Sequence, residues 1–344
     1  MFHTLQSFYR RAFLVGIIAI VLTVIAACGN GNADQKEVNE ASNATGSQHS
    51  APTNDTSGET EPSSEDEAQS STRTFHTIKG DIVIPAAPQR VVTQGFLPYF
   101  LLFDIKPIGA PYWEIEYPHL AGLTDGIEDI GQIDGGSVEK ILSLQPDLIV
   151  TVAQDMYEQY SKIAPTVVIP YESIGDAHKD LRLFGELLGK EAEAEAWLED
   201  FDQKVESSKQ ELQTLNMENE TFSLIGAFDK TYFIYGDGIY RGGQAMYKYL
   251  GLKPPAIIQE QVMDAGKETL EISMEVIPDY AGDHIFLDVS NGAVFDEKSA
   301  LWNSIPAVKN NRVYRLNTDI FWPYDPLAVE MQLDEVLKLL KGSQ

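Results

Sequence analysis

The sequence contains a single cysteine, Cys28, so the chain cannot form an internal disulfide. Basic residues are also scarce: 25 Lys and Arg stand against 52 Asp and Glu, which gives a formal net charge of −27. So acidic a chain is disfavoured as a partner for nucleic acid or for anionic lipid. The stability of the folded part must therefore come from an apolar core, and 43% hydrophobic residues are enough to build one.

Motifs of common exported enzymes and of nucleotide binding are missing. The chain has no G-x-S-x-G, H-E-x-x-H or G-x-x-x-x-G-K-[ST], and the glycines of GDGIYRGG, residues 236–243, lack the G-x-G-x-x-G spacing. The six histidines are scattered without the spacing of metal ligands. We therefore expect no enzyme, no cofactor and no resident metal site. The histidines are His3, His49, His76, His119, His178 and His284.

A long apolar run occurs at residues 12–27, AFLVGIIAIVLTVIAA, after Arg10 and Arg11 and just before Cys28. Basic residues, an apolar run and small residues ahead of a cysteine are typical of an export signal with a lipid attachment site. The pattern resembles a bacterial lipobox, although Ile25 stands where leucine is commonest. We predict a signal peptide at residues 1–27 and lipidation of Cys28. An uncleaved membrane anchor is the alternative, and both place the remaining chain on the extracytoplasmic face of the cell membrane.

The residues after Cys28 are rich in Asn, Ser, Thr, Glu and Gly and have few large apolar side chains. Such a composition cannot repay the conformational entropy that folding costs. We therefore predict that residues 28–73 form a flexible tether between the lipid and the folded part.

Short apolar runs alternate with helical periodicity from Thr74 onward, which predicts an α/β fold with parallel sheets. Residues 176–216 contain no proline and predict one long helix or two abutting ones. We therefore expect two Rossmann-like α/β lobes, residues 74–175 and 217–344, joined by a long rigid helix and enclosing a ligand cleft. The predicted strands include RVVTQG, KPIGA, PDLIVTV, TVVIPY, TFSLIGAF, TYFIYG, DHIFLDV and RVYRLN, and an amphipathic helix closes the chain at residues 326–340.

One phrase occurs twice, at residues 137–150, SVEKILSLQPDLIV, and at residues 273–287, SMEVIPDYAGDHIFL. Each copy has a serine, a glutamate two residues later and an aspartate ten residues after the serine. A serine with a glutamate in the first turn is an ordinary helix N-terminus, since both satisfy free N–H groups or the helix dipole. The repetition also predicts duplicated architecture with a matching surface contact on each lobe, through Glu139 and Glu275.

From about residue 78 to the C-terminus, the chain resembles the helical-backbone substrate-binding proteins of ABC importers that take up ferric siderophores, haem or cobalamin. The phrases PQRVVTQG, YSKIAPTVVIPY and DPLAVEMQLDEVLKLL are similar to this family's opening strand, fourth strand region and closing helix. The resemblance implies that Glu139 and Glu275 dock onto a membrane permease with its ATPase. It also fits the predicted lipoprotein signal and tether, and a monomer suits this role.

The segment YGDGIYRGGQAMYKYLGLKPP, residues 235–255, is similar to a segment of hydroxamate-siderophore receptors in which an arginine before two glycines contacts the ligand. The resemblance implies Arg241 for this role. The chain departs from the pattern at Ile239, where some relatives have a tryptophan that stacks on the ligand. A surface arginine in a turn is the alternative interpretation of Arg241.

A cleft for a ferric chelate needs aromatic walls and a few hydrogen-bond donors. Aromatic residues gather at predicted strand ends, and each could instead be ordinary core. Few basic residues are available for an anionic chelate: Arg241, with Arg182 and Lys248 on helices. The candidate ligand-binding residues are Tyr99, Trp113, Tyr240, Arg241, Trp322 and Tyr324.

We therefore expect the chain to capture a ferric siderophore, of hydroxamate or citrate-hydroxamate type rather than catecholate, and to deliver it to the permease. One alternative is haem or cobalamin, with His119 or Met156 as a conceivable haem ligand. A more distant alternative is an exported siderophore hydrolase. Because a linking helix resists bending, ligand binding should change the angle between the lobes only slightly.

Overall fold

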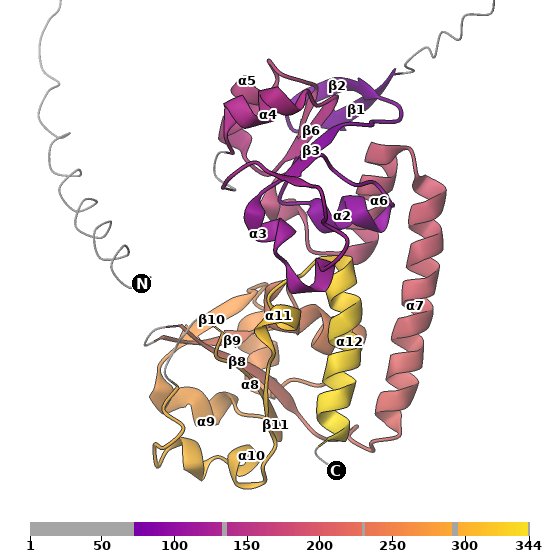
Figure 1. Ribbon diagram of the computed structural model, residues 1–344. Coiled ribbons are helices and arrows are strands. Elements are labelled where there is room, and N and C mark those ends of the chain that lie inside the picture. Colours follow the sequence, from indigo (N-terminus) through magenta and orange to yellow (C-terminus); the bar gives the residue numbers. More distant parts are fainter. Residues whose placement is uncertain (1–71, 133–135, 229–230, 291–294, 343–344) are drawn as a thin grey trace, which may run out of the picture. The chain divides into compact units, whose positions relative to one another are not determined.

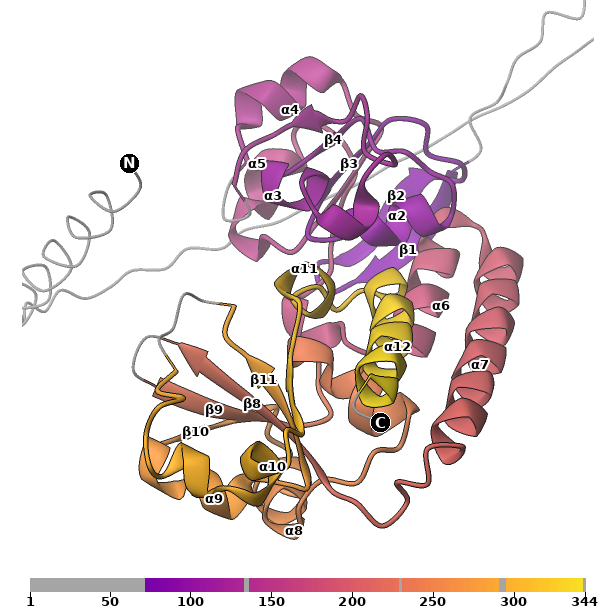
Figure 2. The same ribbon diagram turned by 60° about the horizontal axis from the view of Figure 1, so that its bottom comes forward.

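A computed structural model describes residues 72–132, 136–228, 231–290 and 295–342. The predicted signal peptide, Cys28 and the predicted tether up to residue 71 lie outside these residues. The described residues belong to one compact unit, Asp66–Gln344. They form two α/β lobes; helix α7 (Glu191–Gln213) runs along one side from the first lobe to the second, next to helix α12 (Pro326–Lys341) (Figures 1 and 2).

The first lobe is built on a five-stranded parallel sheet with the order β5-β4-β3-β6-β7. Its central strands β3 and β6 are buried along their whole length because both faces are covered, as is usual for parallel sheets. Val91 and Leu148 face one core, and Val92 and Ile149 face another. The strands are β3 (Val91–Gln94), β4 (Gly109–Ala110), β5 (Glu128–Asp129), β6 (Leu148–Thr151) and β7 (Thr166–Val168); the helices are α2 (Leu97–Leu102), α3 (Tyr112–Ile115), α4 (Val138–Leu144) and α5 (Tyr157–Tyr160).

A hairpin precedes this sheet and was not predicted. Its antiparallel strands are β1 (Thr72–Thr77) and β2 (Gly80–Pro85). Phe75 and Ile84 from the hairpin are buried in the core of the first lobe. Residues 72 and 73, predicted as tether, are therefore part of the first strand.

The second lobe repeats the strand order of the first, as β10-β9-β8-β11-β12, but β9 runs antiparallel to both neighbours. Leu224 and Phe286 face one core, whereas Ile225 and Ile285 face the other. The reversal of β9 was not predicted. The strands are β8 (Phe222–Phe228), β9 (Thr231–Tyr235), β10 (Thr269–Ile272), β11 (His284–Asp288) and β12 (Val313–Arg315); the α-helices are α8 (Ala256–Ile258), α9 (Ile277–Tyr280), α10 (Pro306–Lys309), α11 (Thr318–Phe321) and α12 (Pro326–Lys341).

The aspartates of the repeated phrase have the same structural role in both lobes. Asp147 precedes β6, and its carboxylate accepts the N–H groups of Gln89 at 2.7 Å and Arg90 at 3.0 Å, just before β3. Asp283 precedes β11 and accepts the N–H of Thr221 at 2.8 Å, just before β8. Asp147 therefore helps to set the register between the parallel strands β3 and β6, and Asp283 does the same for β8 and β11. This shared role explains why both copies of the phrase have an aspartate at the same position.

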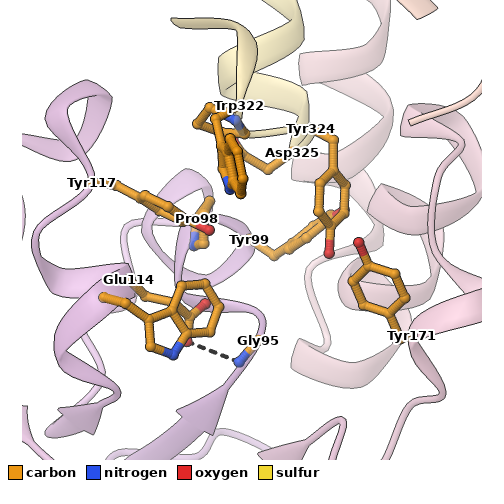
Figure 3. Close-up of a pocket in the computed structure, with 11 residues that line it drawn as sticks. Gly95, Pro98, Tyr99, Glu114, Tyr117, Tyr171, Trp322, Tyr324 and Asp325 are labelled. Atoms are coloured by element: carbon orange, nitrogen blue, oxygen red, sulfur yellow. Dashed lines mark hydrogen bonds between the residues drawn. The ribbon is translucent and has the colours of Figure 1, made fainter. Parts of the chain in front are cut away.

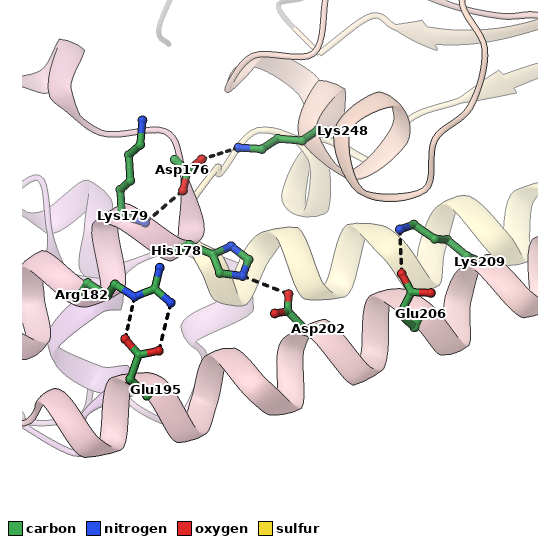
Figure 4. Close-up of polar contacts among 9 residues, drawn as sticks. All are labelled: Asp176, His178, Lys179, Arg182, Glu195, Asp202, Glu206, Lys209 and Lys248. Carbon is green, nitrogen blue, oxygen red and sulfur yellow. Dashed lines mark hydrogen bonds and ion pairs between the residues drawn. The ribbon is translucent and has the colours of Figure 1, made fainter.

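The predicted connecting segment forms two abutting helices, α6 (Ala177–Leu188) and α7 (Glu191–Gln213). Asp176 caps α6 by accepting the N–H of Lys179 at 3.0 Å, and Gly189 ends it with φ of +66°. Ion pairs tie the two helices together, including Arg182 with Glu195 at 2.6 Å (Figure 4). The predicted boundaries at residues 176 and 217 stay predictions.

Helix α7 contacts the cores of both lobes. Ala194 and Leu198 pack into the first-lobe core, Phe201 and Val205 pack into the second-lobe core, and Trp197 contacts both. Helix α12 contacts α7 and also α2 of the first lobe. A wide rotation of the lobes would have to break these contacts or bend α7, which is consistent with the expected small opening.

Candidate functional site

A pocket of about 770 Å³ is lined by both lobes and opens to solvent. Its first-lobe residues follow the carboxyl ends of β3, β4 and β7, and its second-lobe residues lie between α11 and α12 (Figure 3). Ligands of open α/β sheets usually bind beyond the carboxyl ends of the strands. The lining residues are Gly95, Pro98, Tyr99, Trp113, Glu114, Tyr117, Tyr171, Trp322, Pro323, Tyr324 and Asp325.

Four of the predicted binding residues line this pocket, namely Tyr99, Trp113, Trp322 and Tyr324. They come from three separate stretches of the chain, and the structure brings them together from both lobes. Tyr240 and Arg241 are not among the lining residues. Ligand contact by any of the six remains a prediction.

Tyr99 is largely a core residue that also borders the pocket. Its ring stacks on Phe184 with centroids 4.5 Å apart, and its hydroxyl donates to Asp180 at 3.1 Å. Asp180 also accepts the N–H of Gly175 at 2.9 Å, while burial raises the pKa of its carboxyl to about 6. These contacts hold the Tyr99 ring rigidly, so it offers a fixed wall.

Tyr171 and Tyr324 meet across the pocket, one from each lobe. Their rings lie 5.6 Å apart at 84°, an edge-to-face arrangement (Figure 3). Burial raises the pKa of both hydroxyls, so both stay neutral at physiological pH. The two hydroxyl groups interact with each other, so the pair joins the two lobes across the pocket.

Trp322 covers Arg241, which lies behind the pocket wall. The Arg241 guanidinium carbon is 3.8 Å from the centroid of the Trp322 ring, and Arg241 Nε donates to Asp288 Oδ2 at 2.7 Å. Both partners of this ion pair are buried, with side-chain exposures of 10% and 2%. The positive charge of Arg241 is therefore balanced inside the protein, and Arg241 orients Trp322.

The two glycines after Arg241 are required by close packing. Gly242 has φ of +84°, and a Cβ there would lie 2.5 Å from the Phe321 ring. A Cβ on Gly243 would lie 2.1 Å from the carbonyl oxygen of Gly236, which cannot move aside as a side chain could. These glycines let the chain turn after β9 and place Arg241 beneath Trp322.

Glu114 is a buried carboxylate in the pocket wall, 1% exposed. Its oxygens accept the backbone N–H groups of Gly95 at 2.8 Å and Leu97 at 2.9 Å. Burial raises the pKa of Glu114 from 4.5 to about 7, although these hydrogen bonds lower it. A raised pKa favours folding fully below pH 4.5, and this contribution is lost as the pH rises through about 7.

Asp325 is a second carboxylate in the wall. One oxygen accepts the N–H of Ala328 at 3.1 Å and caps α12, and the other lies 3.0 Å from Nε2 of His119. The His119 side chain is only 1% exposed. A histidine so enclosed and paired is poorly placed to ligate a haem iron.

The other basic candidates for the cleft are engaged elsewhere. Arg182 makes a two-point contact with Glu195, at 2.6 and 3.0 Å, on the surface of α6 and α7 (Figure 4). Lys248 reaches Asp176 at 2.7 Å, and neither basic residue lines the pocket. In this structure both side chains are therefore engaged outside the pocket.

Sequence reasoning missed Glu114, Tyr117, Tyr171 and Asp325. Tyr171 ends the predicted strand TVVIPY. Tyr99 was selected as an aromatic residue after a predicted strand, and the same criterion would have selected Tyr171. Glu114 follows Trp113 directly, but nothing in the sequence shows that its carboxylate is buried, because a glutamate is normally exposed.

The predicted docking residues are both exposed, Glu139 on α4 and Glu275 before α9. Ser137 caps α4 by accepting the N–H of Lys140 at 3.1 Å. Ser273 makes no such bond, although its hydroxyl and a backbone N–H lower the pKa of Glu275. The second copy is a short 3-10 turn, so a capping role alone does not explain the glutamate in both copies.

Within the described ranges, no three His, Cys, Asp or Glu side chains gather as a metal site would require. Across the same residues, every helix is too short or too polar to cross a membrane. Neither observation bears on residues 1–71.

The pocket and fold agree with known proteins of one kind. A family model described as periplasmic binding protein matches residues 106–320. The chain is 33% identical to the iron(3+)-hydroxamate-binding protein YxeB of Bacillus subtilis over 340 residues, 96% of this chain and 97% of that protein. It is 32% identical to the iron(3+)-hydroxamate-binding protein FhuD of the same organism over 342 residues, 96% of this chain and 98% of that protein.

Solved structures share the fold. A FhuD fold-family component of a ferrichrome ABC transporter from Bacillus subtilis superposes with a TM-score of 0.71 at 34% identity, covering 77% of this chain and 99% of that one. FhuD2 from Staphylococcus aureus with bound ferrioxamine B superposes with a TM-score of 0.65 at 25% identity, covering 74% of this chain and 100% of that one. The predicted fold, two α/β lobes with a helical connection, is confirmed.

Proposed function

We propose, on the premise that the chain belongs to the periplasmic binding protein family, that it captures a ferric hydroxamate outside the cell and delivers it to an ABC importer. Two similar proteins are named for binding iron(3+)-hydroxamates, and a similar structure holds ferrioxamine B. The observation that carries the proposal is the pocket itself. Its walls are aromatic rings from both lobes, and no lysine or arginine is present among its described lining residues.

The charge of the pocket favours hydroxamates over catecholates. A tris-catecholate iron complex carries roughly three negative charges, which would need several cationic partners in a desolvated site. The charged groups in the described wall are instead Glu114 and Asp325. A neutral iron–hydroxamate centre packed against aromatic rings avoids this repulsion.

Delivery uses surfaces away from the pocket. We propose that acylated Cys28 holds the chain at the membrane and that Glu139 and Glu275, one on each lobe, align it on the permease, which acts with its ATPase. The chain works as a monomer and performs no chemistry on its ligand. The small permitted rotation of the lobes lets the permease recognise the loaded form by the position of these two charges.

Calorimetric titration of residues 72–344 with ferric hydroxamates, a ferric catecholate, ferric citrate, haem and cobalamin tests the function. We expect a hydroxamate to bind with submicromolar Kd and the catecholate at least about 100-fold more weakly, about 2.7 kcal/mol. Tight binding of haem or cobalamin with no response to hydroxamates would overturn the assignment.

A further inference from the structure

The charges that line the pocket have one sign. Glu114 and Asp325 are the charged side chains in its described wall. The oxygens of Glu114 accept backbone N–H groups, and no described basic side chain forms an ion pair with it. An ionised Glu114 is therefore stabilised by two backbone N–H groups and has no cationic partner among the described side chains.

Basic groups close to the wall do not cancel this charge. Arg241 is already paired with Asp288 and lies beneath the Trp322 ring. His119 contacts Asp325 and not Glu114. A ligand that brings its own positive charge would provide what the wall lacks.

We infer that Glu114 makes the pocket select, among ferric hydroxamates, those that carry a protonated amine. The inference rests on the proposed function, because it assigns a specificity within the same pocket. In a partly desolvated site an ammonium near a carboxylate is favoured, and a ligand with a free carboxylate is repelled. The rings of Trp113 and Tyr117 in the same wall provide π faces for cation–π contact with the amine.

The acid–base state of Glu114 gives the selection a pH dependence. Burial raises its pKa to about 7, so the carboxylate forms as the pH rises through that value. Affinity for an amine-bearing chelate should therefore increase from pH 6 to pH 8. The titratable groups that act on Glu114 from other elements are Tyr117, Tyr324 and Asp325, with His119 behind Asp325; the two tyrosines have raised pKa values and stay neutral in this range.

The test compares ferrioxamine B, which has a free amine, with N-acetyl ferrioxamine B, which differs by one acetyl group and one charge. Calorimetric titration of residues 72–344 at pH 8 should give about tenfold tighter binding of the amine form, about 1.4 kcal/mol. At pH 6 the preference should shrink to about threefold or less. The wild-type chain alone decides this comparison, so it does not depend on any variant folding.

Glu114→Gln assigns the preference to the residue. We expect the variant to bind both chelates within about threefold of each other and to lose the pH dependence. The matched control is Glu116→Gln, which removes the same charge from an exposed position at the end of α3 and should keep the tenfold preference.

Equal affinity of the wild-type chain for the two chelates at pH 8 would overturn the inference and leave the proposed function intact. Persistence of the preference in Glu114→Gln would also overturn it. Failure of both chelates to bind would instead contradict the proposed function.

Discussion

The variant carrying both Glu139→Lys and Glu275→Lys should reduce iron–hydroxamate uptake to the level of cells without the protein. Its Kd for the chelate should change less than about twofold. Both glutamates are exposed, one on each lobe, and neither lines the pocket. Reversing them replaces attraction to a basic permease surface by repulsion, which acts on docking and not on ligand capture.

Uptake of radioactive iron by intact cells, with calorimetry on the purified variant, measures both quantities. The matched control is Glu199→Lys with Asp200→Lys on α7, which makes the same change in net charge at exposed positions. The control should retain uptake close to wild type. A loss of ligand affinity in the docking variant would place these glutamates in the binding machinery or the fold.

Asp288→Ala should lower the free energy of unfolding by about 3 to 5 kcal/mol, because it leaves the buried Arg241 guanidinium without its partner. The distance from Arg241 Nε to Asp288 Oδ2 is 2.7 Å, and both side chains are nearly excluded from water. Arg241→Ala should be comparably destabilising, because it leaves the buried Asp288 carboxylate without its partner. An affinity change in either single variant therefore mixes ligand contact with damage to the fold.

The double variant Arg241→Met with Asp288→Leu resolves this, since replacing a buried ion pair by apolar groups is often nearly neutral. Urea unfolding should show most of the stability restored. A single-variant loss below about 1 kcal/mol would show that the pair is solvated. If the restored double variant still binds the hydroxamate, binding requires neither ligand contact by Arg241 nor its contact with Trp322.

The regular core of the fold could be predicted from the sequence. Runs such as LIVT in β6 are mostly apolar and buried throughout because the strand is covered on both faces. The β1–β2 hairpin was missed because β1 has a single large apolar residue, Phe75, and continues directly from the polar segment before it. The reversed β9 was missed because strand direction depends on which neighbours pair, and an apolar run does not carry that information.

The site was predictable where it follows from topology. Tyr99 and Trp113 stand just after strands, and the carboxyl ends of parallel strands converge. The pairing of Arg241 with Asp288 joins residues on different elements, and the burial of Glu114 depends on the packing of α3, which carries it, against the start of α2. Charged residues are by default exposed, so only the folded structure identifies these two exceptions.

The most direct test of ligand capture between the lobes is tryptophan fluorescence of residues 72–344 titrated with a ferric hydroxamate. Trp113 and Trp322 line the pocket, whereas Trp197 and Trp302 pack among core residues. We predict saturable quenching in the wild-type chain, with most of its amplitude lost when Trp113 and Trp322 are both replaced by Phe. Unchanged quenching in that variant would place the ligand elsewhere and contradict the account.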